Sequence, residues 1–263
     1  MKNKKEVLII IPAYNEEKNI SKVLDRLEQP EIAEFADILV MNDASSDNTN
    51  WIVKARHHAV VTHVFNLGYG SALQLGYKYA IRCNYRYVIQ MDADGQHDAG
   101  NLINLYHALK TPDENGVYPD IVLGSRYLND SPYFETSALK RFAFFLFRHI
   151  IKWSTGRTIM DPTTGLQGLS RRAALCYSKF GNFDEKYPDA NMITNMLLSD
   201  FNIVEIPAVM RLREHGKSMH SGLKPIGYMF HMFFSILAVL IRQKIFKNVP
   251  KAERYNNDIQ KTQ

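Results

Sequence analysis

Cysteine is scarce in this sequence, and long apolar runs are absent from its N-terminus. The 263 residues include two cysteines, Cys83 and Cys176, with no CxxC spacing. Two such cysteines cannot form a disulfide framework, so the sequence indicates a reducing compartment. The apolar run at Val7–Ile11 is ended by Pro12, and no small-residue cleavage site follows it. It is typical of a first buried strand rather than of a signal peptide.

The overall composition is that of a globular protein. Apolar residues make up 46% of the chain and charged residues 22%, which excludes disordered and fibrous proteins. A chain of this length can bury a core without disulfides or metals. It fits one mid-sized domain with an appendage, or two very small domains.

Positive charge is concentrated in two segments. The net charge is +5, yet residues 138–157 contain five Lys or Arg and no acid, and residues 211–247 contain seven against Glu214 alone. Both segments are also rich in Phe, Ile, Leu and Met. Basic charge mixed with apolar bulk favours a membrane surface over a nucleic acid, and no RNA-binding or zinc-finger signature is present.

Apolar runs and helical stripes alternate along the first half of the chain. Strands are predicted at Val7–Ile11, Ile38–Met41, Val60–Phe65, Tyr87–Met91 and Ile121–Leu123. Helices are predicted at 16–28, 47–57, 69–83 and 99–110. This alternation is typical of an α/β fold with a mostly parallel central sheet and helices on both faces, whose ligand site lies at the carboxyl ends of the strands.

The pattern changes after residue 124. A polar loop is expected at 128–137, a basic and Phe-rich helix at 138–154, and a turn and strand within 161–170. A last strand is predicted at 202–209 and one apolar helix at 225–246. The polar tail beyond Pro250 is expected to fray.

Two carboxylates follow the fourth predicted strand. Asp92 and Asp94 stand two residues apart in the run Asp-Ala-Asp-Gly-Gln-His. Carboxylates in this position can share Mg²⁺ or Mn²⁺ with a diphosphate, because these ions prefer oxygen ligands and keep sites for phosphate. Asp and Gly are also common in turns that only end a strand, so the run alone leaves both interpretations open.

Two further polar clusters follow neighbouring strands. Asp43 could accept a hydrogen bond from a nucleobase N–H, whereas Asp47 could cap the next helix. Gly68 and Gly70 precede a helix and could let the backbone approach a nucleotide. No Gly-Lys-Ser/Thr follows them, so the loop is not a P-loop.

Together with Pro12-Ala-Tyr-Asn-Glu16, these elements resemble glycosyltransferase family 2, which has the type-A nucleotide-diphospho-sugar transferase fold. The motifs Gly124-Ser-Arg-Tyr127, Asp161-x-Thr-Thr-Gly-Leu-x-Gly168 and Arg213-x-x-Gly216-x-Ser218 narrow the resemblance. They are similar to those of the polyprenyl-phosphate sugar transferases of the dolichyl-phosphate mannose synthase type. The resemblance extends over about residues 6–222.

The resemblance implies roles for the matching positions. A nucleotide-sugar pocket would contain Pro12, Ala13, Tyr14, Glu16, Asp43, Gly68, Gly70 and Asp92. The metal, Mg²⁺ or Mn²⁺, would be bound by Asp92, Asp94 and Gln96. The acceptor phosphate would be held by Arg126, Arg141, Arg213 and Lys217. The catalytic set would be Asp94, Asp161, Arg126 and Arg213, with Asp161 near the reacting sugar.

The sequence departs from the pattern at Met219, where the mannose synthases typically carry Lys. That phosphate contact is therefore absent or comes from Lys217. Arg126 has an alternative interpretation, because an arginine after a strand can simply pair with a buried acid.

The function that the resemblance implies is an inverting transfer of one sugar from a nucleoside-diphosphate sugar to a polyprenyl phosphate, for cell-envelope glycan synthesis or modification. A UDP-sugar is favoured on prevalence in the family. One alternative is transfer to a hydroxyl of a growing polysaccharide, for which Asp189 would be the base. Another is a nucleotide-sugar-binding protein without turnover.

The apolar helix ends in cations, with Lys224 before it and Arg242, Lys244 and Lys247 at its end. It is shorter than the roughly 20 apolar residues of a membrane span, so an interfacial helix is predicted, with a buried core helix as the alternative. The expected division is a catalytic domain at 1–222, an interfacial helix at 223–247 and a polar tail at 248–263. We expect a peripheral protein on the cytoplasmic membrane face, with a small membrane protein or a second copy as a further partner, and no nucleic acid.

Overall fold

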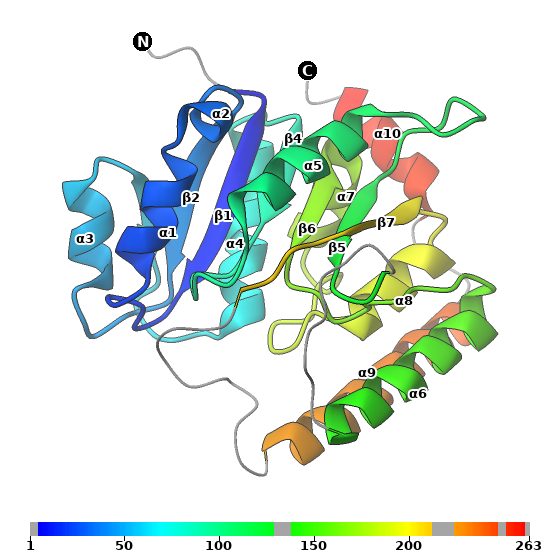
Figure 1. Ribbon diagram of the computed structural model, residues 1–263. Coiled ribbons are helices and arrows are strands. Elements are labelled where there is room, and N and C mark those ends of the chain that lie inside the picture. Colours follow the sequence, from blue (N-terminus) through cyan, green and yellow to red (C-terminus); the bar gives the residue numbers. More distant parts are fainter. Residues whose placement is uncertain (1–4, 129–137, 212–223, 247–250, 261–263) are drawn as a thin grey trace.

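The computed structural model describes residues 5–128, 138–211, 224–246 and 251–260 (Figure 1). Its centre is a seven-stranded sheet in the order β3-β2-β1-β4-β6-β5-β7. The strands are β1 (Val7–Ala13), β2 (Ala36–Asn42), β3 (Ala59–Thr62), β4 (Tyr87–Gln90), β5 (Ile121–Ser125), β6 (Gln167–Ser170) and β7 (Ile203–Pro207).

Helices cover both faces of the sheet (Figure 1). The helices of the first half are α1 (Ile20–Leu27), α2 (Pro30–Ala33), α3 (Thr49–Ala55), α4 (Tyr69–Arg82) and α5 (Ala99–Lys110). Those of the second half are α6 (Ala138–Thr155), α7 (Arg171–Ser178), α8 (Ala190–Leu198), α9 (Lys224–Phe246) and α10 (Ala252–Gln260).

The apolar run of β1 explains the layered packing. Successive side chains of a strand point to opposite faces. Leu8 and Ile10 therefore join one core with α4 and α7, whereas Val7, Ile9 and Ile11 join a second core with α1 and α5. All seven residues of β1 are buried, as expected of a central strand covered on both sides.

The directions of the strands determine at which edge of the sheet the polar motifs meet. β1, β2, β3 and β4 pair in parallel, and β5 pairs in parallel with β7. β6 runs antiparallel between β4 and β5, so the turn that precedes it lies at the edge where β4 and β5 end. The mostly parallel α/β sheet is confirmed, and the polar motifs of both halves meet at this edge.

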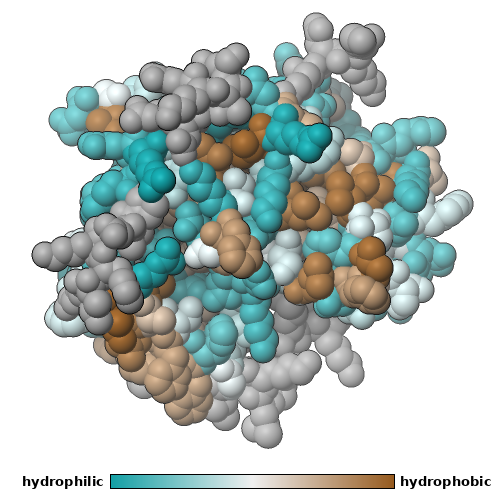
Figure 2. Space-filling view, turned by 180° about the vertical axis from the view of Figure 1, so that it is seen from behind, coloured by the Kyte–Doolittle hydropathy of each residue, from teal (hydrophilic) through white to brown (hydrophobic). Residues whose placement is uncertain are grey.

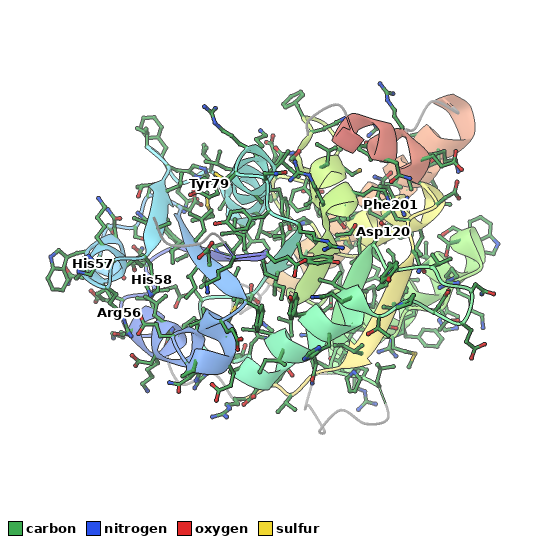
Figure 3. All side chains as sticks on the ribbon, turned by 90° about the horizontal axis from the view of Figure 1, so that it is seen from above. Arg56, His57, His58, Tyr79, Asp120 and Phe201 are labelled. Carbon is green, nitrogen blue, oxygen red and sulfur yellow. The ribbon has the colours of Figure 1, made fainter. Side chains whose placement is uncertain are left out.

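The opposite edge of the sheet carries structural ion pairs. Asp120, just before β5, accepts hydrogen bonds from Nε of Arg172 at 2.7 Å and from the Asn202 backbone N–H at 2.9 Å. Figure 3, the view from above, shows Asp120 beside Phe201, far across the molecule from Arg56. Asp120 thus joins β5, α7 and the entry to β7 at the end of the sheet away from the polar motifs.

The helix predicted at 225–246 is α9, and it packs against α8 and α6. Asn191 donates to the Ser235 hydroxyl at 2.7 Å, and Gln243 donates to Asn195 Oδ1 at 3.4 Å. Met232 and Ile236 on its inner face belong to the main core. Among the described residues, no helix is long and apolar enough to span a membrane.

The expectation of a frayed tail beyond Pro250 is wrong. Residues 252–260 form α10, which packs against α7, and Tyr255 has no exposed surface. Asn182 donates to the Tyr255 hydroxyl at 2.9 Å, and the Lys179 ammonium lies 4.7 Å from its ring centroid. Tyr255 and Ala252, both buried in the main core, therefore dock a segment that is otherwise polar.

Candidate active site

The loops after β1 and β2 are bonded to each other. The Asn15 backbone N–H donates to the Ser45 hydroxyl at 3.0 Å, and the Asn15 side chain accepts from the Ser46 N–H at 2.9 Å. Glu16 N–H donates to Thr49 Oγ1 at 2.8 Å. The structure thus brings Pro12, Ala13, Tyr14 and Glu16 beside the Asp43 loop, with the Tyr14 side chain half exposed at the surface.

Asp43 joins this loop pair to the glycine loop. Its Oδ1 accepts from Leu67 N–H at 2.8 Å and contacts His63 Nδ1 at 2.7 Å, and its Oδ2 accepts from Gly68 N–H at 2.8 Å. The carboxylate is buried and fixes the loop that begins α4. Oδ2 has capacity for a second donor, so base recognition by Asp43 stays a prediction.

The glycine loop lies against a second segment of chain. A Cβ on Gly70 would collide with the carbonyl oxygen of Asp184. Glycine at this position therefore lets α4 begin in direct contact with the loop that leads to α8.

Asp92 is held from two sides just beyond β4. The Tyr69 hydroxyl donates to its Oδ1 at 2.9 Å. On the other side lies the Gly165 backbone, where a Cβ would be only 2.8 Å from Oδ2. His97 is buried, with Nε2 3.7 Å from Oδ2. About a third of the Asp92 side chain is exposed, so a positioned carboxylate faces the site.

Asp94 and Gln96 form the turn that follows. Asp94 is buried, and its Oδ1 accepts from the Gln96 N–H at 3.0 Å. The Gln96 side chain donates to the Arg211 carbonyl at 3.1 Å, and Arg211 N–H donates to the Gln96 carbonyl at 2.7 Å. Asn101 adds a pair of bonds to the backbone of Val209, at 2.7 and 2.9 Å. The carboxylate turn is thereby joined to residues 209–211, which lead toward Arg213.

Arg126 and Asp161 form a buried ion pair. Nε and Nη2 of Arg126 donate to the two Asp161 oxygens, both at 2.7 Å, and Arg126 N–H donates to Oδ2 at 3.0 Å. Nη2 also donates to Thr163 at 3.0 Å. Burial works to lower the pKa of the Arg126 guanidinium, but the Asp161 carboxylate outweighs it and raises this pKa. Asp161 has no exposed surface, so it orients Arg126 rather than facing the site directly.

Asp189, the residue before α8, is a third carboxyl of the site. Tyr228 of α9 donates to its Oδ2 at 2.8 Å. Burial raises the pKa of the Asp189 carboxyl to about 7, and Asp92 acts in the same direction. The hydrogen bond from Tyr228 and the charge of Arg126 oppose this shift. The charges of Asp92, after β4, and of Arg126, after β5, therefore both act on the pKa of Asp189.

Comparison with known proteins agrees with this arrangement. The glycosyl transferase family 2 model matches residues 8–177, which is more than half of the chain. The chain belongs to glycosyltransferase family 2. It is therefore a glycosyltransferase of the type-A fold, as the motifs predicted.

Two relatives within the family have names that indicate lipid-phosphate substrates. The chain is 27% identical to the polyprenol monophosphomannose synthase of Mycolicibacterium smegmatis, over 82% of this chain and 81% of that protein. It is 26% identical to a UDP-N-acetylglucosamine–dolichyl-phosphate N-acetylglucosaminyltransferase of Methanococcus voltae, over 64% and 71%. Similarity to these two enzymes supports the predicted subgroup.

A solved structure shares the fold. The glucosyl-3-phosphoglycerate synthase of Mycobacterium tuberculosis, in complex with Mn²⁺, UDP and phosphoglyceric acid, superposes with a TM-score of 0.63. The identity is 19%, and the match covers 91% of this chain and 78% of that one. At this identity the similarity shows a common fold.

The carboxylates of this glycosyltransferase suit a shared metal site. In the described residues, no group of three or more His, Cys, Asp or Glu is arranged to hold a metal ion. Mg²⁺ commonly takes only one or two carboxylates and fills its other positions with water and substrate phosphate. Asp92, fixed by Tyr69 and Gly165, and Asp94 two residues later fit an ion that a diphosphate completes.

The predicted phosphate-binding residues are spread out. Arg126 lies in the site, whereas Arg141 is exposed on α6. Arg213 and Lys217 lie outside the described residues, so their predicted roles are not located by the structure.

Four side chains near the site were not predicted as site residues. Tyr69 follows Gly68 in a loop that was already singled out, so its position was a usable signal. The sequence predicts Asp189 only as the base of the alternative reaction, transfer to a polysaccharide hydroxyl. Tyr228 sits in an apolar helix and Arg148 in a basic one, where nothing in the sequence separates them from their neighbours.

Proposed function

We propose that this protein transfers one sugar, with inversion, from a nucleoside-diphosphate sugar to a polyprenyl phosphate at the cytoplasmic face of a membrane, in cell-envelope glycan synthesis. A UDP-sugar is the favoured donor. The enzyme is proposed to need Mg²⁺ or Mn²⁺, to be peripheral, and to bind the membrane surface directly. A small membrane protein or a second copy of the chain is a further proposed partner.

One observation carries this proposal. Asp92, at the proposed diphosphate end, and Arg126, at the proposed acceptor end, both contact the turn at residues 161–165: Gly165 lies against Asp92, and Asp161 and Thr163 accept from Arg126. Groups suited to a departing diphosphate and to an incoming anion therefore meet at one turn. The named activities of the relatives in Mycolicibacterium and Methanococcus support the same pairing of substrates.

The residues present suit an anionic acceptor. A phosphate oxygen is already charged near neutral pH, so its attack on the anomeric carbon requires no strong base. Arg126 presents a guanidinium fixed by Asp161, which would orient the phosphate. Asp92 and Asp94 would hold the metal, and this ion would neutralise the charge on the departing diphosphate.

The proposed membrane contact is the outer face of α9. Five large apolar side chains on it are at least 39% exposed: Phe230, Phe233, Phe234, Leu237 and Ile241. Figure 2, seen from behind, shows brown side chains gathered along the lower left of the molecule, over α9. Phe145 and Trp153 of α6 are also exposed. An apolar face with flanking cations matches the chemistry of a bilayer interface.

The test of this proposal is product analysis with the full chain. Radiolabelled UDP-sugars and GDP-mannose are incubated with polyprenyl phosphate and Mn²⁺, with and without a chelator. A butanol-extractable, mild-acid-labile labelled lipid is expected, and the best donor identifies the nucleotide. Absence of lipid product with every donor would overturn the acceptor assignment.

A second acceptor class is favoured by one specific observation. Asp189 is a partly buried carboxyl in the site, bonded to Tyr228 and with a pKa raised to about 7, which suits a general base for a sugar hydroxyl. On this alternative, the labelled product is a polysaccharide, and Asp189→Asn abolishes transfer. For a phosphate acceptor, the same variant should retain substantial activity.

A further inference from the structure

The charge of Arg126 is already balanced within the protein. Both oxygens of Asp161 accept from its guanidinium, and the Asp161 carboxylate is fully buried. The pair as a whole is neutral. A phosphomonoester carries up to two negative charges, so Arg126 alone supplies orientation but little net positive charge.

A second arginine stacks on the same aromatic ring. The guanidinium carbon of Arg148 lies 5.1 Å from the ring centroid of Tyr127, and that of Arg126 lies 5.5 Å from it. Phe144, one helical turn before Arg148 on α6, also contacts Tyr127, with 5.5 Å between centroids. Both cationic groups thus lie within 5.5 Å of the centre of the Tyr127 ring.

Arg148 is left without an acceptor. Its Nε is buried, with no hydrogen-bond partner, and no carboxylate among the described residues lies within 4.0 Å of its guanidinium. A buried N–H without an acceptor costs free energy, and native proteins rarely leave one. A guanidinium with a buried, unpartnered Nε, over a ring that a second guanidinium also contacts, is an arrangement that an anion would complete.

The inner face of α6 adjoins the site. Phe147, next to Arg148, has no exposed surface and contacts the Tyr228 ring edge-on at 6.5 Å. Tyr228 in turn donates to Asp189. By contrast, Arg141 and Lys152 on the same helix are exposed. Of the α6 basic side chains that the structure describes, Arg148 is the one turned toward the site.

We infer that Arg148, stacked on Tyr127, binds the phosphomonoester of the acceptor together with Arg126. This inference rests on the proposed function and assigns to Arg148 the phosphate contact that the sequence had assigned to Arg141. The planar guanidinium can donate two parallel N–H groups to phosphate oxygens, which a lysine cannot. Tyr127 fixes its plane by stacking.

The test measures binding and kinetics of the full-length Arg148→Gln protein. Farnesyl phosphate is the lipid probe, inorganic phosphate the headgroup probe, and UDP with Mn²⁺ the donor-side probe. Lys152→Gln is the matched control, because it removes the same charge from an exposed position of the same helix. Arg148→Lys keeps the positive charge but removes the planar guanidinium with its parallel N–H groups. Circular dichroism checks that each variant is folded.

We expect Arg148→Gln to weaken farnesyl phosphate binding and raise the acceptor KM by 10-fold or more, with UDP binding unchanged. Arg148→Lys should recover part of the loss, and Lys152→Gln should behave as the wild type. Inorganic phosphate should compete with farnesyl phosphate for the wild type but not for Arg148→Gln. This result would show that Arg148 contacts the phosphate rather than the isoprenoid chain.

Three results would overturn the inference in different ways. Equal farnesyl phosphate binding by Arg148→Gln and wild type would remove Arg148 from the acceptor site while leaving the proposed function intact. Wild-type protein that binds no farnesyl phosphate would overturn the proposed function and this inference together. If Arg148→Gln lost only flotation with anionic vesicles and kept farnesyl phosphate binding, Arg148 would be a contact to membrane headgroups. This result would also overturn the inference.

Discussion

The Tyr228 hydroxyl lies 2.8 Å from Oδ2 of Asp189, so a helix with an apolar outer face donates a hydrogen bond to the centre of the site. Tyr69 makes the equivalent contact from the other side, to Asp92. Burial, together with the nearby Asp92 and Asp189 carboxylates, raises the pKa of Tyr69 well above its ordinary value, so this hydroxyl stays a donor. Asp92 and Asp189 are thus each oriented by a tyrosine from a different helix.

Removing either predicted metal ligand should abolish transfer. Asp92→Asn and Asp94→Asn are each expected to lower kcat/KM at least 100-fold and to weaken Mn²⁺ binding, because the amide is a poorer ligand than the carboxylate. Mn²⁺ affinity is measured by electron paramagnetic resonance in the presence of UDP. Asp25→Asn, on the outer side of α1, is the control and should bind normally. Full activity of the wild type in excess chelator would contradict the prediction.

Breaking the buried ion pair should destabilise the protein. Asp161→Asn leaves the Arg126 guanidinium buried without its carboxylate, which costs about 3–5 kcal/mol in such pairs. Urea unfolding monitored by circular dichroism provides the measurement. Asp200→Asn removes a pair with Lys251 whose side chains are 67% and 54% exposed, and should cost less than about 1 kcal/mol. Equal losses in both variants would show that Asp161 is not a structural partner of Arg126.

Asp189 should make stability depend on pH. Its pKa is raised from 3.8 to about 7, so the folded protein holds a proton that the unfolded chain releases. The free energy of unfolding should therefore fall as pH rises from about 4 to about 7. Asp189→Asn should flatten this dependence and be more stable than the wild type at pH 8, by roughly 2–4 kcal/mol. Urea titrations at pH 5 and pH 8 without metal test this, and parallel curves for the two proteins would refute it.

The outer face of α9 should govern membrane binding. Replacing Phe230, Phe234 and Leu237 with Ser removes exposed apolar area without touching the inner residues Met232 and Ile236. Flotation with anionic liposomes should fall by roughly tenfold or more, since 1.4 kcal/mol is a factor of ten and each side chain contributes about that much. Trp51→Ser, at an exposed position of α3, is the control. Unchanged flotation of the triple variant would assign membrane binding to another surface.

Local patterns were sufficient for the layered sheet. The continuous apolar run of β1 predicted a strand buried on both faces, and the spacing of strands and helices predicted the parallel sheet. The start of α1 was less predictable, because Glu16 is occupied by a hydrogen bond from the Asn19 side chain at 2.7 Å and the helix begins only at Ile20. Such a contact forms only in the folded loop, and it produces no hydrophobic periodicity in the sequence.

The site was predictable where a motif marks a strand end, as at Asp92 and Arg126. It was not where a residue acts through tertiary contact. Tyr228 looks like any other member of an apolar helix, and its role appears only once α9 lies against α8. Similarly, Ala252 and Tyr255 dock a polar segment against the core, although its composition alone predicts an unstructured tail.

Tyr228, Ser235 and Gln243 of α9 contact Asp189 before α8, Asn191 in its first turn and Asn195 in its middle, and these contacts have a mechanical consequence. A helix fastened at three points about two turns apart cannot swing on a hinge. On a bilayer, its outer face would set the tilt of the whole sheet, and the mouth of the site would stay at a constant height above the lipid headgroups. The phosphate end of the proposed polyprenyl acceptor would then have to move out of the bilayer to reach the site, because the enzyme would not tilt toward it.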